Sequence, residues 1–536
     1  MSAAASRAMT ATLRRASRPL PFALSLLLIV LGAGILRLPG LSWERALGPA
    51  AKGFTFHIDE WTFVNKIRGF ERRSPTWSGY VRGWTTQGWL LEQAGYRLLK
   101  LKDVDIIALL RRMSFVYGLL TIILVGVTGL KLFGSQELGL WAAAFTALSG
   151  LHVVNSHFGM ADSSATFYDL LAILLAGVFD RSHKDWAFAC LGVVVGASLA
   201  IKFQISPLPL LMLVCLRDRR RWLRSAQAAL YVVAGFQIFS FFNYTPWEMK
   251  SFIHMLHANL EQPSEAPRDL LFVPRALVLG IGFGASLLVA LGLFSVANRI
   301  RGLPRAETGK RLVHSPWLYP GVAGLTQYLL VSEMDMRAMR QTLVLIPIAA
   351  LIAGRGIVWL RARWARSAAS SWVVSAFLVA VILYQVYSVS TIERLYAQDP
   401  RFAAAQWLAT HVRPDESVTA YRKEYSRFPS PCRFVDYPSD YVFGTALEYD
   451  RYLKASDPSQ VTHTEGEERW RFWNQLFRGE LSYDLVRRFT LPVVTPELLV
   501  IEKLGWTDMG LFLPREAVIF KKRSQLDAVP VSAEGI

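Results

Sequence analysis

Long apolar runs recur through most of this chain and limit the folds open to it. Leu20–Leu36, Met113–Leu130, Leu138–Val154 and Ala276–Ala297 are each about as long as an α-helix must be to cross a hydrocarbon core of roughly 30 Å. Such runs continue to about residue 390, so a signal peptide alone does not account for them. With 52% hydrophobic residues over 536 positions, the composition indicates a polytopic α-helical membrane protein.

The runs predict about eleven membrane-spanning helices. We expect the first to be retained, because no small-residue cleavage site follows it. The run 205–217 is short and starts with Ser206-Pro207, so residues 186–217 form either two full helices or a broken pair. The predicted spans are 20–38, 113–132, 138–155, 163–180, 186–202, 205–217, 225–243, 273–297, 312–331, 341–358 and 371–390.

Basic residues set the expected orientation. The formal net charge is +18, which in a soluble protein would suggest nucleic acid as a partner. Here Arg and Lys gather in loops between apolar runs, so the positive-inside rule accounts for them and no nucleic acid is expected. The N-terminus is then cytoplasmic, and an odd number of spans places the C-terminal segment outside a bacterial inner or plasma membrane. The basic groups on the cytoplasmic side are Arg14–Arg18, Arg217–Arg224, Arg299–Arg311 and Arg361–Arg366.

The chain is expected to have three parts. A cytoplasmic N-terminus (1–19) precedes a transmembrane core (20–390), whose long first outer loop covers 39–112, and an extracytoplasmic C-terminal domain (391–536) follows. The first outer loop mixes Trp and Tyr with Arg and Lys, which is typical of helices lying in the membrane interface. This loop is basic although it lies on the outer side, which binding to lipid headgroups or to a phosphate substrate would explain. The C-terminal segment is polar with short apolar runs, and we predict a small α/β domain there.

Three acidic residues on the outer side are the candidates for chemistry, and a fourth lies deeper in the same helix as one of them. Asp59 and Glu60 follow His57 just after the first span, as a general base or a sugar-binding carboxylate, or else as a solvated pair on a loop. Asp162 opens a later span, where its carboxylate either caps the helix or lines a cavity. Asp169 shares the same helix face two turns deeper and must face protein or water, where it could bond to a neighbouring helix.

Cationic residues at helix ends are candidates for binding a lipid-linked phosphate. Lys202 ends one span, and Arg337 and Arg340 precede another on the outer side. Lys202 could instead snorkel to the interface, and the two arginines could pair with nearby acids. The sequence identifies no cofactor with certainty. A divalent metal ion stays open, because His254 and His257 share an outer loop, whereas the three cysteines show no zinc spacing.

The order of these segments resembles the GT-C superfamily of membrane glycosyltransferases. The look-alikes are the family 39 protein O-mannosyltransferases and the aminoarabinose lipid A transferases. Each motif is weak alone, and it is their joint order that carries the resemblance. The segments are Asp59-Glu60, His152–His157 with Asp162–Phe167, Gly192–Phe203, Asn243–Trp247 with Phe252, Arg340–Pro347 and Asp399–Val418.

The resemblance implies a GT-C helical core and a polyprenyl-phosphate-linked sugar donor. It implies that Asp59 is the general base and that Asp162 matches a second acid of the family. It also implies that Lys202 and Arg340 bind the phosphate of the donor. Trp61 and its neighbours follow the acidic pair where the aminoarabinose transferases carry Arg or Tyr. No outer loop is long enough for the β-trefoil insertion usual in family 39. The acceptor therefore stays open among a lipid, a glycan and a protein.

The expected function is sugar transfer to a hydroxyl group on the extracytoplasmic face, with Asp59 as general base and a single inversion at the anomeric carbon. Glu60 and Asp162 are the other catalytic candidates, and His57, Lys202, Arg337 and Arg340 are the substrate-binding candidates. The main alternative is a polytopic transporter or flippase of a lipid-linked or anionic substrate. A third class is a non-catalytic partner that binds through its outer domain.

Overall fold

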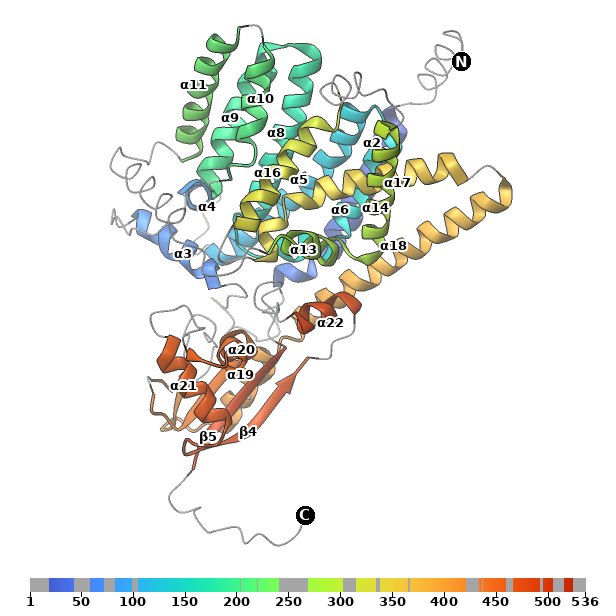
Figure 1. Cartoon of the computed structure of the whole chain (residues 1–536). Helices are drawn as coiled ribbons and strands as arrows, with labels where there is room; N and C mark the ends of the chain where they lie inside the picture. Colours follow the sequence, from blue (N-terminus) through green and yellow to red (C-terminus); the bar gives the residue numbers. More distant parts are fainter. Residues whose placement is uncertain are drawn as a thin grey trace, which may run out of the picture. The chain divides into compact units, whose positions relative to one another are not determined.

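The chain folds into two compact units, one mainly helical and one built around a sheet (Figure 1). The helical unit comprises Met1–Leu41 and Thr62–Ser390, and the second comprises Ser42–Trp61 and Thr391–Ile536. The computed structural model describes residues 19–42, 58–71, 82–98, 105–202, 204–218, 220–240, 269–301, 315–333, 338–364, 367–420, 433–435, 437–458, 466–491, 495–504 and 515–523.

Helices form nearly all of the first unit, in agreement with the expected fold class. The described helices up to the second unit are α2 (Pro19–Arg37), α3 (Ile58–Glu71), α4 (Arg82–Leu98), α5 (Ile106–Phe133), α6 (Gln136–Ala147), α7 (Gly150–Asn155), α8 (Asp162–Ser182), α9 (Asp185–Lys202), α10 (Leu208–Arg217), α11 (Arg221–Phe239), α13 (Phe272–Ile281), α14 (Phe283–Arg301), α16 (Leu318–Glu333), the 3-10 helix η2 (Met339–Thr342), α17 (Leu345–Trp364) and α18 (Ala368–Ala397).

In the part of the chain that the structure describes, each of the eleven predicted spans overlaps at least one helix, but fewer of these helices are long enough to cross a membrane alone. Within the described residues, six helices are long and apolar enough, or seven if the bent pair α13–α14 forms one span. The short α10 and α16 do not reach the required length, and α11 carries Arg221 and Arg224 in its first turn. Length and hydropathy therefore do not reproduce the predicted number of spans.

Two predicted single spans are broken. Residues 138–155 form α6 and α7, which are separated by Leu148 and Ser149. Residues 273–297 form α13 and α14, which meet at an angle of 119°. Gly282 lies at that bend with φ +92°, a conformation that favours glycine. The Gln385 amide donates to the Ile281 carbonyl at 2.9 Å and occupies the space where a side chain of residue 282 would lie.

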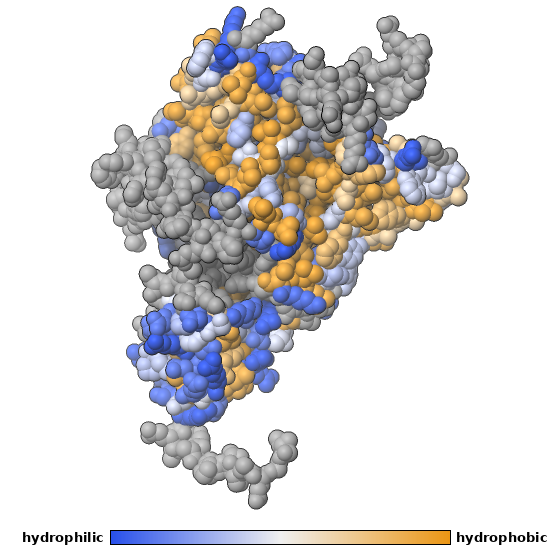
Figure 2. Space-filling view, viewed as in Figure 1, coloured by the Kyte–Doolittle hydropathy of each residue, from blue (hydrophilic) through white to orange (hydrophobic). Residues whose placement is uncertain are grey.

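The helices of the first unit pack in a continuous set of neighbours. Helix α9 lies against α8 and α11, α5 against α6 and α8, and α17 against α6 and α14. Their outward faces carry exposed Leu, Val and Ile side chains, notably on α2 and α18. Figure 2 shows apolar residues over this helical unit and polar residues over the second. An apolar outer face is what a protein surrounded by lipid requires.

The second unit is a small α/β domain, as expected. Its sheet has the order β2-β1-β3-β5-β4, in which β1 is parallel to β2 and β3, while β5 is antiparallel to β3 and β4. Val442, Tyr449, Trp473 and Val518 lie in its buried core. The described elements are α19 (Pro400–His411), β1 (Ser417–Ala420), β2 (Arg433–Phe434), β3 (Tyr441–Thr445), α20 (Ala446–Lys454), α21 (Gly466–Phe477), β4 (Tyr483–Thr490), α22 (Pro496–Lys503) and β5 (Glu516–Lys522).

Candidate active site

A partly buried ion pair joins two of the predicted site residues. Asp162 is the first residue of α8 and Lys202 the last of α9, and these consecutive helices pack together. Lys202 Nζ donates to Asp162 Oδ1. The Asp162 side chain is only 1% exposed, whereas that of Lys202 is 31% exposed. The pair therefore presents an ammonium group at its outer edge and keeps its carboxylate out of water.

The structure contradicts the alternative that Asp162 caps its helix. The N-cap position is occupied by Ala161, and no side chain bonds to the free backbone N–H groups there. The carboxylate is instead turned toward Lys202. Its second oxygen, Oδ2, is buried and has no hydrogen-bond partner among the described residues. A buried carboxylate oxygen without a partner is costly and is a feature of functional sites.

The loop that precedes Asp162 is buried and is held by side chains that donate to its backbone carbonyls. Trp84 Nε1 donates to the Gly159 carbonyl at 3.2 Å, and Ser114 Oγ donates to the Met160 carbonyl at 2.9 Å. Ser163 Oγ donates to the Asn155 carbonyl at 2.9 Å. These bonds come from α4, α5 and α8, and together they fix the position from which Asp162 projects.

The same loop and the preceding α7 contribute two histidines to a cluster that sequence reasoning did not assign. Arg37 is completely buried at the end of α2, and its Nη2 donates to His152 Nδ1 at 3.0 Å. His157 Nε2 lies 2.7 Å from the Arg37 carbonyl oxygen. Because a guanidinium only donates and a carbonyl only accepts, His152 accepts at Nδ1 and His157 donates from Nε2. Burial lowers the pKa of His157 to about 3, so this ring is neutral near pH 7.

Aromatic side chains of α4, α5 and α8 form a second group. Tyr117 donates to Gln87 Oε1 at 2.9 Å, and its hydroxyl oxygen lies 3.2 Å from that of Tyr168. The Tyr117 ring also contacts those of Trp84 and Phe167. The aromatic residues of the first outer loop, which include Trp84, are a signal for this cluster in the sequence, whereas Tyr117 and Tyr168 lie within predicted spans and no pattern marks them.

Helix α4 covers the end of α9 next to Lys202. Gly83 is the contact point, because a Cβ there would lie 2.5 Å from the carbonyl oxygen of Ala200. We expect Gly83→Ala to push α4 away from α9 and to lower both the melting temperature in detergent and the affinity for a lipid-linked phosphate. The matched control is Gly321→Ala, since nothing lies within 4 Å of that Cβ position. Equal melting temperatures for the two variants would contradict this prediction.

Of the remaining candidate residues, some lie within the described part of the chain and others lie outside it. Asp59 lies in the first turn of α3, and its side chain is outside the described residues. Glu60 is in the same turn and fully buried, so the solvated-loop alternative is wrong for this residue. Arg340 is half-buried in η2. The described residues contain no group of three His, Cys, Asp or Glu side chains that could hold a metal ion. Outside them lie His57, Arg337, His254 and His257.

Asp169 bonds to the neighbouring helix, as one interpretation of the sequence suggested. Its Oδ1 accepts from Ser198 Oγ on α9 at 2.9 Å, and its Oδ2 accepts from Ser206 Oγ. Asp162 and Asp169 therefore both face α9, in keeping with their shared face on α8.

A comparison with protein-family models gives a match to part of this chain. Residues 100–257 match the protein-family model for dolichyl-phosphate-mannose-protein mannosyltransferase, and this range contains both Asp162 and Lys202. A search of curated proteins finds no match to the chain.

Solved structures give a similarity over nearly the whole chain. The oligosaccharyltransferase from Archaeoglobus fulgidus in its apo form superposes with a TM-score of 0.54 at 11% identity, covering 94% of this chain and 88% of the other. ArnT from Cupriavidus metallidurans bound to undecaprenyl phosphate gives a TM-score of 0.46 at 14% identity, covering 93% and 98%. The first similarity shows a shared fold.

Proposed function

We propose that this chain, which is a membrane glycosyltransferase of the GT-C superfamily, transfers a sugar from a polyprenyl-phosphate donor to a hydroxyl group of a lipid, glycan or protein. The enzyme class expected from the sequence is confirmed by the family match together with the shared fold. Neither supports the transporter or flippase alternative. The roles of individual residues, the acceptor and the orientation in the membrane are the proposal.

The partly buried Asp162–Lys202 pair is the observation that carries the proposed site. Lys202 is about one-third exposed while its partner is buried, so the ammonium can meet a phosphate without leaving the carboxylate. A cation at this position stabilises the negative charge that the phosphate gains as the sugar departs. We assign Arg340, and with it Arg337, to the same phosphate. His57 is proposed as a further substrate contact.

The proposed reaction is a single displacement at the anomeric carbon. The acceptor oxygen forms a bond to this carbon while the bond to the donor phosphate breaks, and its electron pair goes to the phosphate oxygen. The acceptor hydroxyl is a poor nucleophile near neutral pH, so its proton passes to a carboxylate as attack proceeds. Asp59 is proposed as this base, with Glu60 and Asp162 as the other catalytic residues. Recovery of product with the donor's own anomeric configuration would contradict a single inversion.

The protein is an integral multi-pass membrane protein. We further propose a cytoplasmic N-terminus and an extracytoplasmic C-terminal domain in a bacterial inner or plasma membrane. The positions of the Arg-rich loops support this orientation. It places the Asp162 end of α8 and the Lys202 end of α9 on the outer side, where the acceptor is expected.

The proposal is tested with purified protein in detergent and a panel of radiolabelled polyprenyl-phosphate sugars. Release of label to water counts as turnover, so an unknown acceptor does not hide activity. We expect one donor to lose its label in the presence of the protein. Binding of no donor, and release from none, would overturn the proposed function.

A further inference from the structure

We propose that Asp169 is a positioning residue that fixes, through a buried hydrogen-bond network, the two segments carrying Lys202 and Arg340. This inference rests on the proposed function, because it assigns a purpose to the geometry of the two phosphate-binding cations. Asp169 itself touches no substrate in this scheme.

The network first fixes the chain on both sides of Lys202. Ser198 and Ser206, which both donate to the Asp169 carboxylate, lie on either side of Lys202 in the sequence. Ser198 is one turn earlier in α9, and Ser206 is in the connection to α10. Asp169 and both serines are almost completely buried. One carboxylate on α8 therefore holds the chain before and after the point where α9 ends.

The network then continues to η2. Gln204 Nε2 donates to Ser206 Oγ at 2.9 Å and to Gln327 Oε1 at 2.5 Å. Gln327 Nε2 in turn donates to the backbone carbonyl of Gln341 at 2.7 Å. Gln341 follows Arg340 directly in η2. The path from α8 to Gln341, next to Arg340, thus consists of contiguous hydrogen bonds between buried side chains and ends at a half-buried backbone carbonyl.

The donors and acceptors along this path match in only one arrangement. The Ser206 hydroxyl donates to Asp169 and accepts from Gln204, whose amide nitrogen gives its second hydrogen to Gln327. Reversing either amide would bring two donors or two acceptors together. Because these side chains are buried, removing one hydrogen-bond partner leaves the next group unsatisfied, since water cannot replace the lost bond. A substitution of Asp169 is therefore expected to shift the positions of both Lys202 and Arg340.

The test compares Asp169→Asn and Gln327→Leu with Thr326→Val. Thr326 is adjacent to Gln327, and among the described residues its hydroxyl donates to the Val322 carbonyl of the same helix at 2.8 Å, so it controls for substitution in α16. We expect the first two variants to raise the KM for donor and to lower kcat, so that kcat/KM falls by at least about tenfold, because the misplaced cations contact the phosphate both in the bound donor and in the transition state. A fall in active fraction or melting temperature at constant KM would show a merely structural role and overturn the inference.

A second readout does not depend on activity. Labelling of Lys202 by an amine-reactive reagent, followed by mass spectrometry, is compared with that of the exposed Lys184 at the other end of α9. We expect faster labelling of Lys202 in both network variants and unchanged labelling of Lys184. Unchanged labelling of Lys202 would overturn the inference, whereas an inactive wild type would overturn only the proposed function. If Asp169→Asn does not fold, Gln327→Leu still decides the question.

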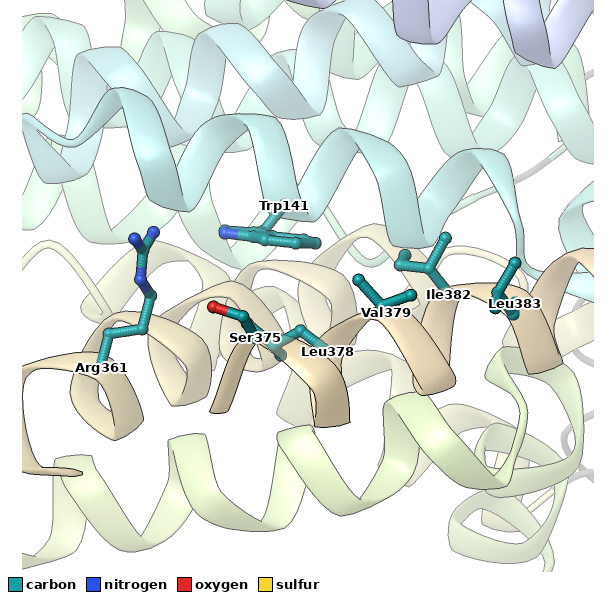
Figure 3. Close-up of a pocket in the computed structure, with 7 residues that line it drawn as sticks. All are labelled: Trp141, Arg361, Ser375, Leu378, Val379, Ile382 and Leu383. Carbon is teal, nitrogen blue, oxygen red and sulfur yellow. The ribbon is translucent and has the colours of Figure 1, made fainter. Parts of the chain in front are cut away.

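An independent observation concerns a groove of about 310 Å³ between α6, α17 and α18 (Figure 3). One end is polar: Arg361 and Ser375 lie there, and Figure 3 shows the indole nitrogen of Trp141 pointing toward the same end. The other end is apolar and is formed by the stripe Leu378–Leu383 of α18.

The polar end lies where the membrane interface is expected. Trp364 and Trp372 are 61% and 77% exposed on either side of the turn between α17 and α18, and exposed tryptophans of this kind mark headgroup depth. Arg361 Nη1 also pairs with Glu137 Oε1 at 2.6 Å, so a carboxylate lies next to the guanidinium group that lines the polar end of the groove.

From this arrangement we infer that the groove holds a phosphatidylethanolamine molecule, as a lipid site separate from the donor site. The phosphate matches Arg361, the ammonium matches Glu137, and one acyl chain lies along Leu378–Leu383. An anionic lipid without an ammonium group would complement only half of this charge pair.

Native mass spectrometry of the delipidated protein with added phosphatidylethanolamine or phosphatidylglycerol tests this inference. Phosphatidylethanolamine should bind preferentially, and Arg361→Gln or Val379→Trp should weaken it about fivefold. Glu137→Gln should remove the preference between the two lipids. Arg363→Gln, an exposed change at the same helix end that does not line the groove, is the control. Equal binding of both lipids to the wild type, or no effect of Val379→Trp, would overturn it.

Discussion

Asp59→Asn is expected to reduce sugar transfer by about 10²–10⁴-fold, the range by which a general base accelerates such a step. The amide keeps the size of the carboxylate but cannot take the proton of the acceptor hydroxyl. Donor binding and the melting temperature should change little. Initial rates with the preferred donor, together with a donor-binding titration, measure both effects.

The control for this variant is Asp185→Asn, which removes an acid that is 80% exposed at the start of α9, away from the Lys202 end. It should retain the wild-type rate. Full activity of Asp59→Asn would contradict its role as the base. Glu60→Gln and Asp162→Asn would then be the variants to compare.

Lys202→Met is expected to abolish donor binding and also to destabilise the helical unit. It removes the ammonium proposed for the donor phosphate and leaves the buried Asp162 carboxylate without its partner. Losing the partner of a buried charge lowers the free energy of unfolding by about 1–3 kcal/mol when the pair is partly open to solvent, less than for a fully enclosed pair. Thermal unfolding and titration with polyprenyl phosphate separate the two consequences.

The double variant Asp162→Asn/Lys202→Met distinguishes structure from binding. A neutral amide no longer needs a cation, so the double variant should recover much of the melting temperature lost in Lys202→Met. Donor binding should stay lost, because the ammonium is still absent. Lys184→Met, which removes an exposed lysine from the α8–α9 turn, controls for the loss of one positive charge. Recovery of donor binding in the double variant would contradict the assignment of Lys202 to the phosphate.

Hydrophobic runs were sufficient to place the helices of the fold, because span length follows directly from the thickness of the bilayer. They could not predict the breaks. The bend at Gly282 depends on Gln385, which is far away in the sequence and fills the space beside it. Such a contact between distant segments leaves no periodic signal. The short α10, by contrast, was expected to be unusual because of Ser206-Pro207.

The candidate site was predictable where charge stood out against an apolar background. Asp162, Asp169 and Lys202 were each identified in this way, because a charged side chain in or next to a membrane span is energetically costly and is usually paired or functional. Their pairing was not, and neither was Arg37. Arg37 ends a span near the membrane edge, where a basic residue is common, so only its complete burial against His152 makes it notable.

The Arg37 cluster also bears on how the kinetics of this enzyme should be interpreted. Both histidines are fixed in one tautomer by groups that cannot change roles, and His157 stays uncharged throughout the range in which enzymes are usually assayed. An inflection in the rate between pH 5 and 8 would therefore not report this imidazole. It would instead report the groups proposed to meet the substrate, such as His57 and the acids of the site, so a pH–rate profile gives information on these groups and not on the buried His157.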